Sequence, residues 1–180
     1  MSLDSLGDLI PEYARDLRLN ISSVLTPQGA PGLNERQIAS LALATAIAAR
    51  SATLTRTVEA WARPQLDDVS INGARAAAAV MGMNNIYYRF LHLVEDKEYQ
   101  TLPARLRMNV IGNPGIDKID FELYSLAVSA VNGCGMCLTS HERKLREEGV
   151  SREAIQSAVR IAAVIHAVAA VLEYVESAAA

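Results

Sequence analysis

Alanine-rich apolar stretches restrict the fold of this chain more than any other feature of its sequence. In Ala76–Met83, for example, four consecutive alanines are followed by valine and methionine. Alanine has the highest helix propensity, whereas strands favour β-branched and aromatic residues. Aromatic residues make up only 5% of the 180 residues. The sequence therefore predicts an all-α fold and a single domain over residues 1–180, long enough to bury its own core.

Cap and turn residues divide the chain into helices. Asn34 followed by Gln37 is typical of a capping box, Pro64 ends or kinks a helix, and Asn113-Pro114-Gly115 indicates a turn. With the apolar spacing, these signals predict the following helices: an amphipathic segment over Leu6–Leu17, Asn34–Arg50, a segment ending near Pro64, Val69–Leu93 with a break near Asn84-Asn85, a short helix over Pro103–Met108, Asp117–Val131, a helix from Cys134 to Gly149, and Ser151–Glu176. We expect loops at Thr26–Gly32 and Glu95–Gln100.

The two halves of the chain resemble one another weakly at an offset of 84 residues. Leu54 then falls on Leu138 and Val80 on Val164, but several of the other matches are alanines, which are common here. This register places Arg50–Thr57, which has no cysteine or histidine, over Cys134–His141. Two interpretations stay open: two similar helical halves with chemistry only in the second, or chance similarity.

Charge and hydropathy exclude several classes of protein. The formal net charge is −3 and no basic patch is present, which argues against a nucleic-acid surface. The N-terminus lacks the apolar core of a signal peptide, and no uninterrupted run of 18 apolar residues occurs. We therefore expect a cytoplasmic protein that binds neither nucleic acid nor membrane.

The only two cysteines lie in Cys134-Gly135-Met136-Cys137, and His141 follows four residues later. On a helix, steps of three and four residues place these three side chains on one face. Asn132 and Gly133 interrupt the preceding apolar run, so we expect Cys134 at a helix N-terminus, where unpaired N–H groups and the helix dipole stabilise a thiolate. In such motifs the thiol pKa falls from about 8.5 to roughly 3.5–7.5. In a reducing compartment the pair is redox-active or metal-binding rather than a structural staple.

Three other interpretations of the cysteines fit the sequence less well. A zinc site needs four ligands, and although His92, His141 and His166 could complete it, no second close-spaced pair accompanies the first. If the two cysteines were only small buried core residues, the neighbouring Gly133, Gly135 and His141 would have no explanation. A thioredoxin-like motif requires a βαβ context that the sequence lacks. A redox dithiol on a helical scaffold, without bound metal or cofactor, is the favoured prediction.

The residues around the motif resemble those of a known family. Glu122, Cys134-Gly135-Met136-Cys137 and His141 match the Glu–x11–Cys-x-x-Cys–x3–His signature of the alkylhydroperoxidase AhpD family, within the carboxymuconolactone decarboxylase-like superfamily. The similarity covers nearly the whole chain and includes Pro11–Ala14, Ala79–Asn85, Leu106–Asn109, Gly112–Ile116 and Phe121–Leu123. It implies an all-helical homotrimer that acts in peroxide defence.

The resemblance also implies roles for the site residues. Cys137 would attack and pass through a sulfenic acid or mixed disulfide, Cys134 would be the proton donor that resolves it, and Glu122 and His141 would relay protons. The dithiol would reduce a partner peroxiredoxin, AhpC, or organic peroxides directly. Electrons would come from the dihydrolipoyl group of a lipoylated 2-oxoacid dehydrogenase acyltransferase. Met136 stands where some members carry a second histidine, so that histidine's relay step has no equivalent here.

The sequence thus predicts a lipoyl-dependent alkyl hydroperoxide reductase. Two alternatives stay open. One is a lyase of the carboxymuconolactone decarboxylase type, in which the cysteines would be incidental. The other is a non-catalytic helical or zinc-stabilised binding module.

Overall fold

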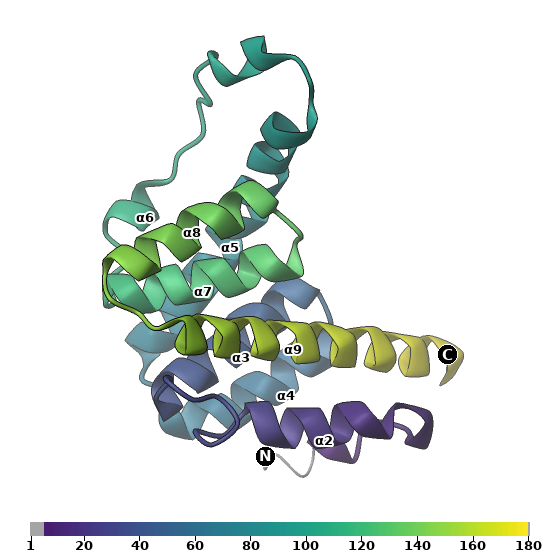
Figure 1. Cartoon of the computed structure of the whole chain (residues 1–180). Coiled ribbons are helices and arrows are strands. Elements are labelled where there is room, and N and C mark those ends of the chain that lie inside the picture. The colour runs from purple at the N-terminus through teal and green to yellow at the C-terminus, as the bar shows by residue number, and fades with distance from the viewer. Residues whose placement is uncertain (1–5, 180) are drawn as a thin grey trace.

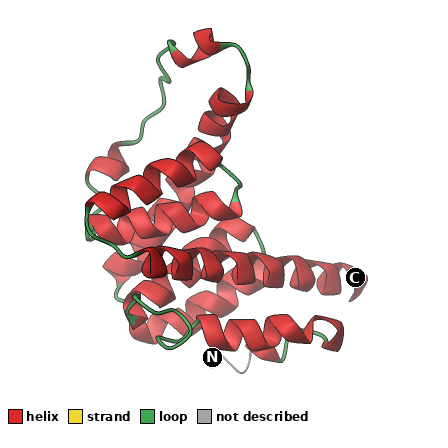
Figure 2. Cartoon of the chain, in the orientation of Figure 1, coloured by secondary structure: helices red, strands yellow, loops and turns green. Residues whose placement is uncertain are grey.

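The structure, a computed structural model, describes residues 6–179. All regular elements in this part of the chain are helices, and it contains no strand, which confirms the all-α prediction (Figure 2). In chain order they are η1 (Glu12–Ala14), α2 (Arg15–Val24), α3 (Glu35–Ala49), α4 (Ala52–Ala62), η2 (Arg63–Gln65), α5 (Asp68–Leu93), η3 (Lys97–Gln100), α6 (Asn109–Gly112), α7 (Lys118–Val131), α8 (Gly135–Glu147) and α9 (Arg152–Ala179).

Helices α3 and α7 form the centre of the molecule (Figure 1). α3 packs against α4, α5, α7 and α9, and α7 packs against α3, α5, α8 and α9. Residues 38–46 of α3 and residues 123–129 of α7 are all buried. Small alanine side chains on α3 let these helices lie close together, and the burial of their apolar surface stabilises the fold. Helix α8 packs against α7 and α5.

The predicted caps are present. The Asn34 side chain accepts the N–H of Gln37 at 2.9 Å, and the Gln37 side chain accepts the N–H of Asn34 at 3.0 Å, which completes the capping box. Asp117 caps α7, and Ser151 accepts the N–H of Ala154 at 3.0 Å at the start of α9. Because these side chains satisfy N–H groups that have no partner inside their helices, the helices begin within a residue of the predicted positions.

Helix α5 is continuous, so the predicted break near Asn84-Asn85 is wrong. The Asn85 amide donates to the Ser129 hydroxyl at 2.8 Å and accepts from the Asn132 amide at 3.0 Å. A buried asparagine with both polar groups paired across to α7 has no competing bond to its own backbone, so it does not end the helix.

Two other local predictions are also wrong. Residues 103–108 are irregular, because Arg105 has a φ of +52° that no α-helix accommodates, and α6 begins only at Asn109. The N-terminal segment is not one helix: η1 follows Pro11, and α2 starts at Arg15. Pro11 has extended backbone, with a ψ of 164°, and so ends the turn before it, while Ala14, with a φ of −113°, interrupts the helical conformation between η1 and α2.

The end of α5 and residues 94–108 project beyond the rest of the helices (Figure 1). The Phe90 and Tyr99 rings meet edge to face here, with centroids 5.1 Å apart. Ile86, Leu93 and Leu102 are exposed. The projection therefore carries apolar surface that the chain itself does not cover.

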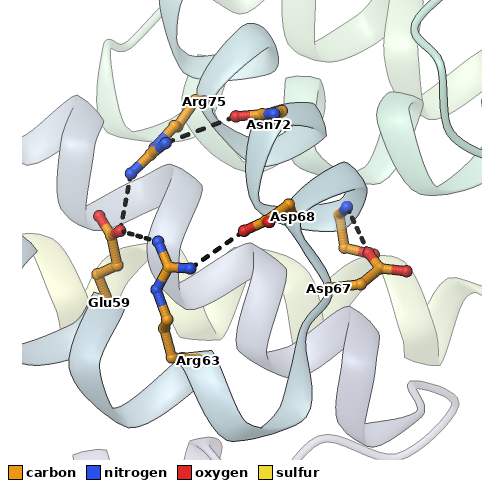
Figure 3. A network of polar contacts seen from close by, with 7 residues as sticks. Glu59, Arg63, Asp67, Asp68, Asn72 and Arg75 are labelled. Carbon is orange, nitrogen blue, oxygen red and sulfur yellow. Dashed lines mark hydrogen bonds and ion pairs between the residues drawn. The ribbon is translucent and has the colours of Figure 1, made fainter.

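An ion-pair network joins α4, η2 and α5 (Figure 3). Glu59 accepts from Arg75 at 2.7 Å and from Arg63 at 3.2 Å, and Arg63 also donates to Asp68 at 3.1 Å. Partial burial raises the pKa of Glu59, but the hydrogen bonds from Arg75 and Arg63 outweigh this and hold it below its ordinary value. The network holds the corner at which the chain turns from α4 into α5.

Helices α3, α4 and α5 recur in the same order as α7, α8 and α9. Arg50 and Gly133, with φ of +64° and +67°, precede the N-caps Ser51 and Cys134, each of which accepts a backbone N–H at 3.3 Å. This supports two similar helical halves. At these caps the offset is 83 residues, from 51 to 134, so the predicted register of 84 is wrong by one here.

Among the described residues, one helix, α9, is long and apolar enough to cross a bilayer. Half of its most apolar window is buried inside the molecule, and the core helix of a soluble protein passes the same test. The absence of a membrane span stays a prediction.

Candidate active site

The cysteine pair occupies the first turn of α8, as predicted. Cys134 is the N-cap, with extended backbone, and its Sγ accepts the N–H of Cys137 at 3.3 Å. Gly133 has a φ of +67°, which glycine adopts without steric cost and which turns the chain from α7 into α8. The first turn of α8 therefore offers N–H groups and the positive end of a helix dipole to a sulfur that carries negative charge.

Cys134 and Cys137 form a disulfide, with Cα atoms 5.3 Å apart. Their burial differs: Cys134 is fully buried, whereas Cys137 is 6% exposed. Cys137 also lines a cavity that Cys134 does not line. Cys137 is thus the outer sulfur of the pair and the one that a small molecule reaches first.

Glu122 and His141 form a close polar pair across the α7–α8 interface. The Nδ1 atom of His141 lies 2.6 Å from Oε2 of Glu122, and the side chains are only 13% and 20% exposed. When Nδ1 carries its proton and donates to the carboxylate, Nε2 is left to accept or release a proton. His141 lies one helical turn after Cys137, so the pair is placed to manage protons at that sulfur.

A cavity of about 590 Å³ is lined by both Cys137 and the Glu122–His141 pair. Its apolar lining comes from Met81, Tyr88, Met108, Ile111 and Met136. Its polar lining comes from Asn84, Glu122, Cys137, Ser140, His141, Arg143, Lys144 and Glu147. Such a division suits a molecule with a reactive polar head and an apolar tail.

The cavity rim carries charges of both signs from α8. Arg143 and Lys144 are exposed cations, and Glu147 is an exposed anion. The Lys144 ammonium donates to Glu148 at 2.7 Å, and this hydrogen bond raises the pKa of Lys144. Because opposite charges stand side by side, the rim does not select for ligand charge of one sign.

The remaining histidines lie outside this cavity. His92 is exposed near the end of α5 and lines a separate cavity of about 530 Å³ with Gly135 and Met136. His166 is exposed on α9. Across residues 6–179, no three His, Cys, Asp or Glu side chains are grouped so that they could hold a metal ion.

Sequence reasoning missed the contribution of α5 to the site. Met81, Asn84 and Tyr88, at helical spacing, line the cavity from α5. A polar pair, Asn84-Asn85, inside an alanine-rich helix was the available signal, and it was interpreted as a helix break. Asparagine in the middle of a helix also indicates a side chain with a specific partner or task.

Comparison with known proteins places these features in a family. The carboxymuconolactone decarboxylase family matches residues 97–180, which include the cysteine motif. A protein named alkyl hydroperoxide reductase AhpD from Rhodospirillum centenum is 55% identical over 173 residues, which are 96% of this chain and 91% of that protein. Proteins of the same name from Hyphomonas neptunium and Streptomyces coelicolor are each 56% identical over 96% of this chain, and over 94% and 96% of their own lengths.

The fold and the site together define a helical dithiol protein related to the carboxymuconolactone decarboxylases. At this level of identity over almost the whole length, the chain belongs to the alkyl hydroperoxide reductase AhpD family.

Proposed function

We propose that this protein is an antioxidant thiol oxidoreductase with alkyl hydroperoxide reductase activity. One observation carries the proposal: a disulfide at a helix N-terminus has its outer sulfur, Cys137, in the same cavity as a Glu122–His141 pair. A redox couple and an acid–base pair that share one cavity are the parts that thiol-dependent peroxide reduction needs. The names of the AhpD relatives agree with this activity.

The proposed cycle begins with the reduced pair. His141 takes the proton of the Cys137 thiol, and the thiolate attacks the terminal oxygen of a hydroperoxide. An S–O bond forms, the O–O bond breaks, and the alkoxide that leaves takes the proton back from His141 to give an alcohol. The Cys134 thiol then attacks the sulfenic acid at Cys137, which releases water and forms the disulfide. Glu122 holds the imidazole in place throughout.

A dithiol substrate must reduce the disulfide to close the cycle. The dihydrolipoyl group of a 2-oxoacid dehydrogenase acyltransferase suits this role, because its long apolar arm ends in two thiols and the cavity has an apolar lining. We propose the peroxiredoxin AhpC as a second electron acceptor of the reduced dithiol, besides hydroperoxides. With this electron donor the protein itself needs no bound cofactor. We place the reaction in the cytoplasm, where dihydrolipoyl groups are kept reduced.

Reconstitution tests the proposal. Dihydrolipoamide dehydrogenase, a lipoylated acyltransferase, this protein and AhpC are mixed with NADH, and NADH oxidation is followed after a hydroperoxide is added. We expect peroxide-dependent oxidation that needs this protein and that disappears with Cys137→Ser. Omission of AhpC separates direct peroxide reduction from transfer to the peroxiredoxin.

Two outcomes would favour the alternatives. No peroxide-dependent turnover in any combination, together with intact thiols after peroxide treatment, would favour a lyase in which the cysteines are incidental. Stoichiometric zinc in the purified protein, lost together with the fold on chelation, would favour a zinc-stabilised module.

A further inference from the structure

Two arginines meet at Asn132, two residues before the cysteine motif. Arg89 of α5 donates from Nη1 to the backbone carbonyl oxygen of Asn132 at 2.6 Å, and Arg50, the C-cap of α3, donates to the Asn132 side-chain oxygen at 3.5 Å. The side-chain amide of Asn132 in turn donates to Asn85 at 3.0 Å. The turn that leads from α7 into Cys134 is therefore tied to both α3 and α5.

Arg89 brings to this turn a positive charge that no carboxylate balances. The residue is half-buried, and it forms no ion pair with the acidic side chains of residues 6–179. An arginine side chain stays protonated in proteins. Its hydrogen bond to Asn132 satisfies a carbonyl group at the C-terminal end of α7, which is a structural role. The charge gains a second role from the sulfur that follows in the chain.

Cys134 is a buried sulfur that must carry negative charge during reduction of the disulfide. It is fully buried, whereas Cys137 lines the cavity and is the sulfur that a reductant reaches. Attack on Cys137 therefore expels Cys134 as a thiolate. A buried charge is costly unless other groups compensate it. The Cys137 N–H, 3.3 Å from the Cys134 sulfur, supplies part of this compensation. Arg89 is placed to supply more, because the Cα atoms of Asn132 and Cys134 lie at most about 7 Å apart.

The other charged groups around the motif do not favour a thiolate in this way. They are Glu122 with His141 on the α7–α8 interface, Arg143 and Lys144 with Glu147 at the cavity rim, and His92 on α5. The first two groups combine charges of opposite sign, and the rim side chains and His92 are exposed to water, which screens them. Arg89 is thus the half-buried cation that is bonded to the turn beside the buried sulfur.

We propose that Arg89 is a positioning residue that stabilises the Cys134 thiolate when a dithiol reduces the disulfide. The inference rests on the part of the proposed function in which a dithiol substrate closes the cycle. A thiolate of the reductant attacks the sulfur of Cys137, a mixed disulfide forms, and the Cys134–Cys137 bond breaks with its electron pair on Cys134.

The second thiol of the reductant completes the reaction. As a thiolate it attacks the reductant sulfur of the mixed disulfide, which releases Cys137 and leaves the reductant as a disulfide. The two protons of the reductant thiols pass to the two cysteines. Because a thiol of lower pKa is the faster leaving group, Arg89 should accelerate the first step and also favour the reduced state of the pair.

Arg89→Met and Arg89→Lys test the role of the charge. Methionine is an unbranched side chain without charge, whereas lysine keeps the positive charge. The oxidised proteins are reduced with dithiothreitol, samples are quenched with iodoacetamide, and free thiols are counted by intact mass. Loss of a nearby cation raises a thiol pKa by about one unit, and exchange rates follow with an exponent of about 0.4–0.5, so Arg89→Met should be reduced about threefold more slowly. Its redox equilibrium with dithiothreitol should shift toward the disulfide by up to about tenfold. Arg89→Lys should stay close to the wild type in both measurements.

Arg56→Met is the matched control, since Arg56 is an exposed arginine of α4 that also forms no ion pair with the acidic side chains of the described residues. It should change neither the rate nor the equilibrium. If Arg89→Met does not fold, Arg89→Gln provides the same measurements without the charge.

Melting temperatures are measured in parallel, because loss of the bond to Asn132 can also lower stability. Two results would overturn the inference: an unchanged rate and equilibrium in Arg89→Met, or equal losses in Arg89→Met and Arg89→Lys. The experiment uses no peroxide. A wild type that does not turn over hydroperoxide would therefore contradict the proposed peroxide chemistry without deciding the role of Arg89, which the dithiothreitol measurements decide.

Discussion

At the scale of single residues, the proton chemistry that we propose depends on the hydrogen bond between Glu122 and His141. With Nδ1 held by the carboxylate at 2.6 Å, the imidazole is fixed in position and keeps Nε2 for the reaction. We expect His141→Phe to lower the rate of hydroperoxide reduction by about 10²–10⁴-fold, as is typical for a lost acid–base group. Glu122→Gln, which can still hold the ring, should lower it less and change the pH–rate profile.

Both variants are compared with the wild type by stopped flow at a series of pH values, with melting temperatures measured in parallel. An unchanged rate per folded molecule with a lower melting temperature would mean that His141 is only a packing residue and Glu122 only its hydrogen-bond partner.

The site could be predicted from sequence only where its residues share one helix. Cys134, Cys137 and His141 follow the spacing of α8, and spacing is visible in a sequence. The contact between Glu122 and His141 depends on how α7 packs against α8, which spacing does not reveal. The prediction that Glu122 belongs to the site therefore rested on the family resemblance alone. Asn84 was missed because its place depends on which face of α5 lies toward α8.

At the scale of elements, Asn85 shows how tertiary contacts can override local propensity. Its two hydrogen bonds, to Ser129 and Asn132, tie α5 to the end of α7 just before the cysteine motif. Asn85→Ala leaves the buried Ser129 hydroxyl without its partner, so we expect the free energy of unfolding to fall by about 1–3 kcal/mol. Urea unfolding measures this, with Asn72→Ala as the exposed control on the same helix. A loss equal to that of the control would mean that the Asn85 bonds contribute nothing to stability.

The network around Glu59 predicts a pH-dependent contribution at the α4–α5 corner. Because the pKa of Glu59 is lowered in the fold, its contribution is fully present above the pKa of an unfolded glutamate, about 4.3, and is lost as pH falls through the folded value. For this partly exposed ion pair we expect Glu59→Gln to destabilise by no more than about 1 kcal/mol at pH 7. The difference from wild type should shrink below about pH 4 and in high salt. A difference that is the same at pH 3 and pH 7 would show that the carboxylate charge plays no part.

Helices with cap residues at their ends were predicted well, because a cap satisfies backbone groups through local bonds that a sequence displays. The helix that begins after Asn34 and the helix that begins after Asp117 are examples. Residues 103–108 were predicted wrongly because a positive φ at Arg105 has no signal in an arginine. The continuity of α5 was missed because the partners of Asn85 lie more than 40 residues away.

At the scale of the whole molecule, the two similar halves differ in chemistry. With the offset of 83 residues at the caps, Glu122, Cys137 and His141 correspond to Ala39, Leu54 and Val58, all fully buried. The first half thus has apolar side chains at these three positions, and at the position of Cys134 it has the cap residue Ser51. The sequence already indicated that only the second half carries cysteine and histidine at these positions. The exact alignment of the two halves became clear only from the positions of the helix caps.

We expect the protein to assemble as a homotrimer, with the Met81–Leu93 region and the N-terminal helical segment in the subunit contacts. Ile86, Phe90 and Leu93 are 53%, 45% and 69% exposed and lie on one face of α5, while Leu19 of α2 is 67% exposed. Light scattering at micromolar concentration should give the mass of a trimer, and Ile86→Glu should shift it toward a monomer. Val69→Glu, at the far end of the same helix, is the control. A monomeric wild type would contradict this assembly.

The most direct test of the dithiol cycle compares three proteins after reduction: wild type, Cys137→Ser and Cys134→Ser. Each is treated with one equivalent of cumene hydroperoxide and analysed by intact mass with and without dimedone, which labels sulfenic acids. We predict that the wild type loses two hydrogen atoms as its disulfide forms, that Cys134→Ser gains a dimedone-labelled sulfenic acid at Cys137, and that Cys137→Ser stays unmodified. Peroxide turnover at the wild-type rate in both single variants would contradict the dithiol mechanism.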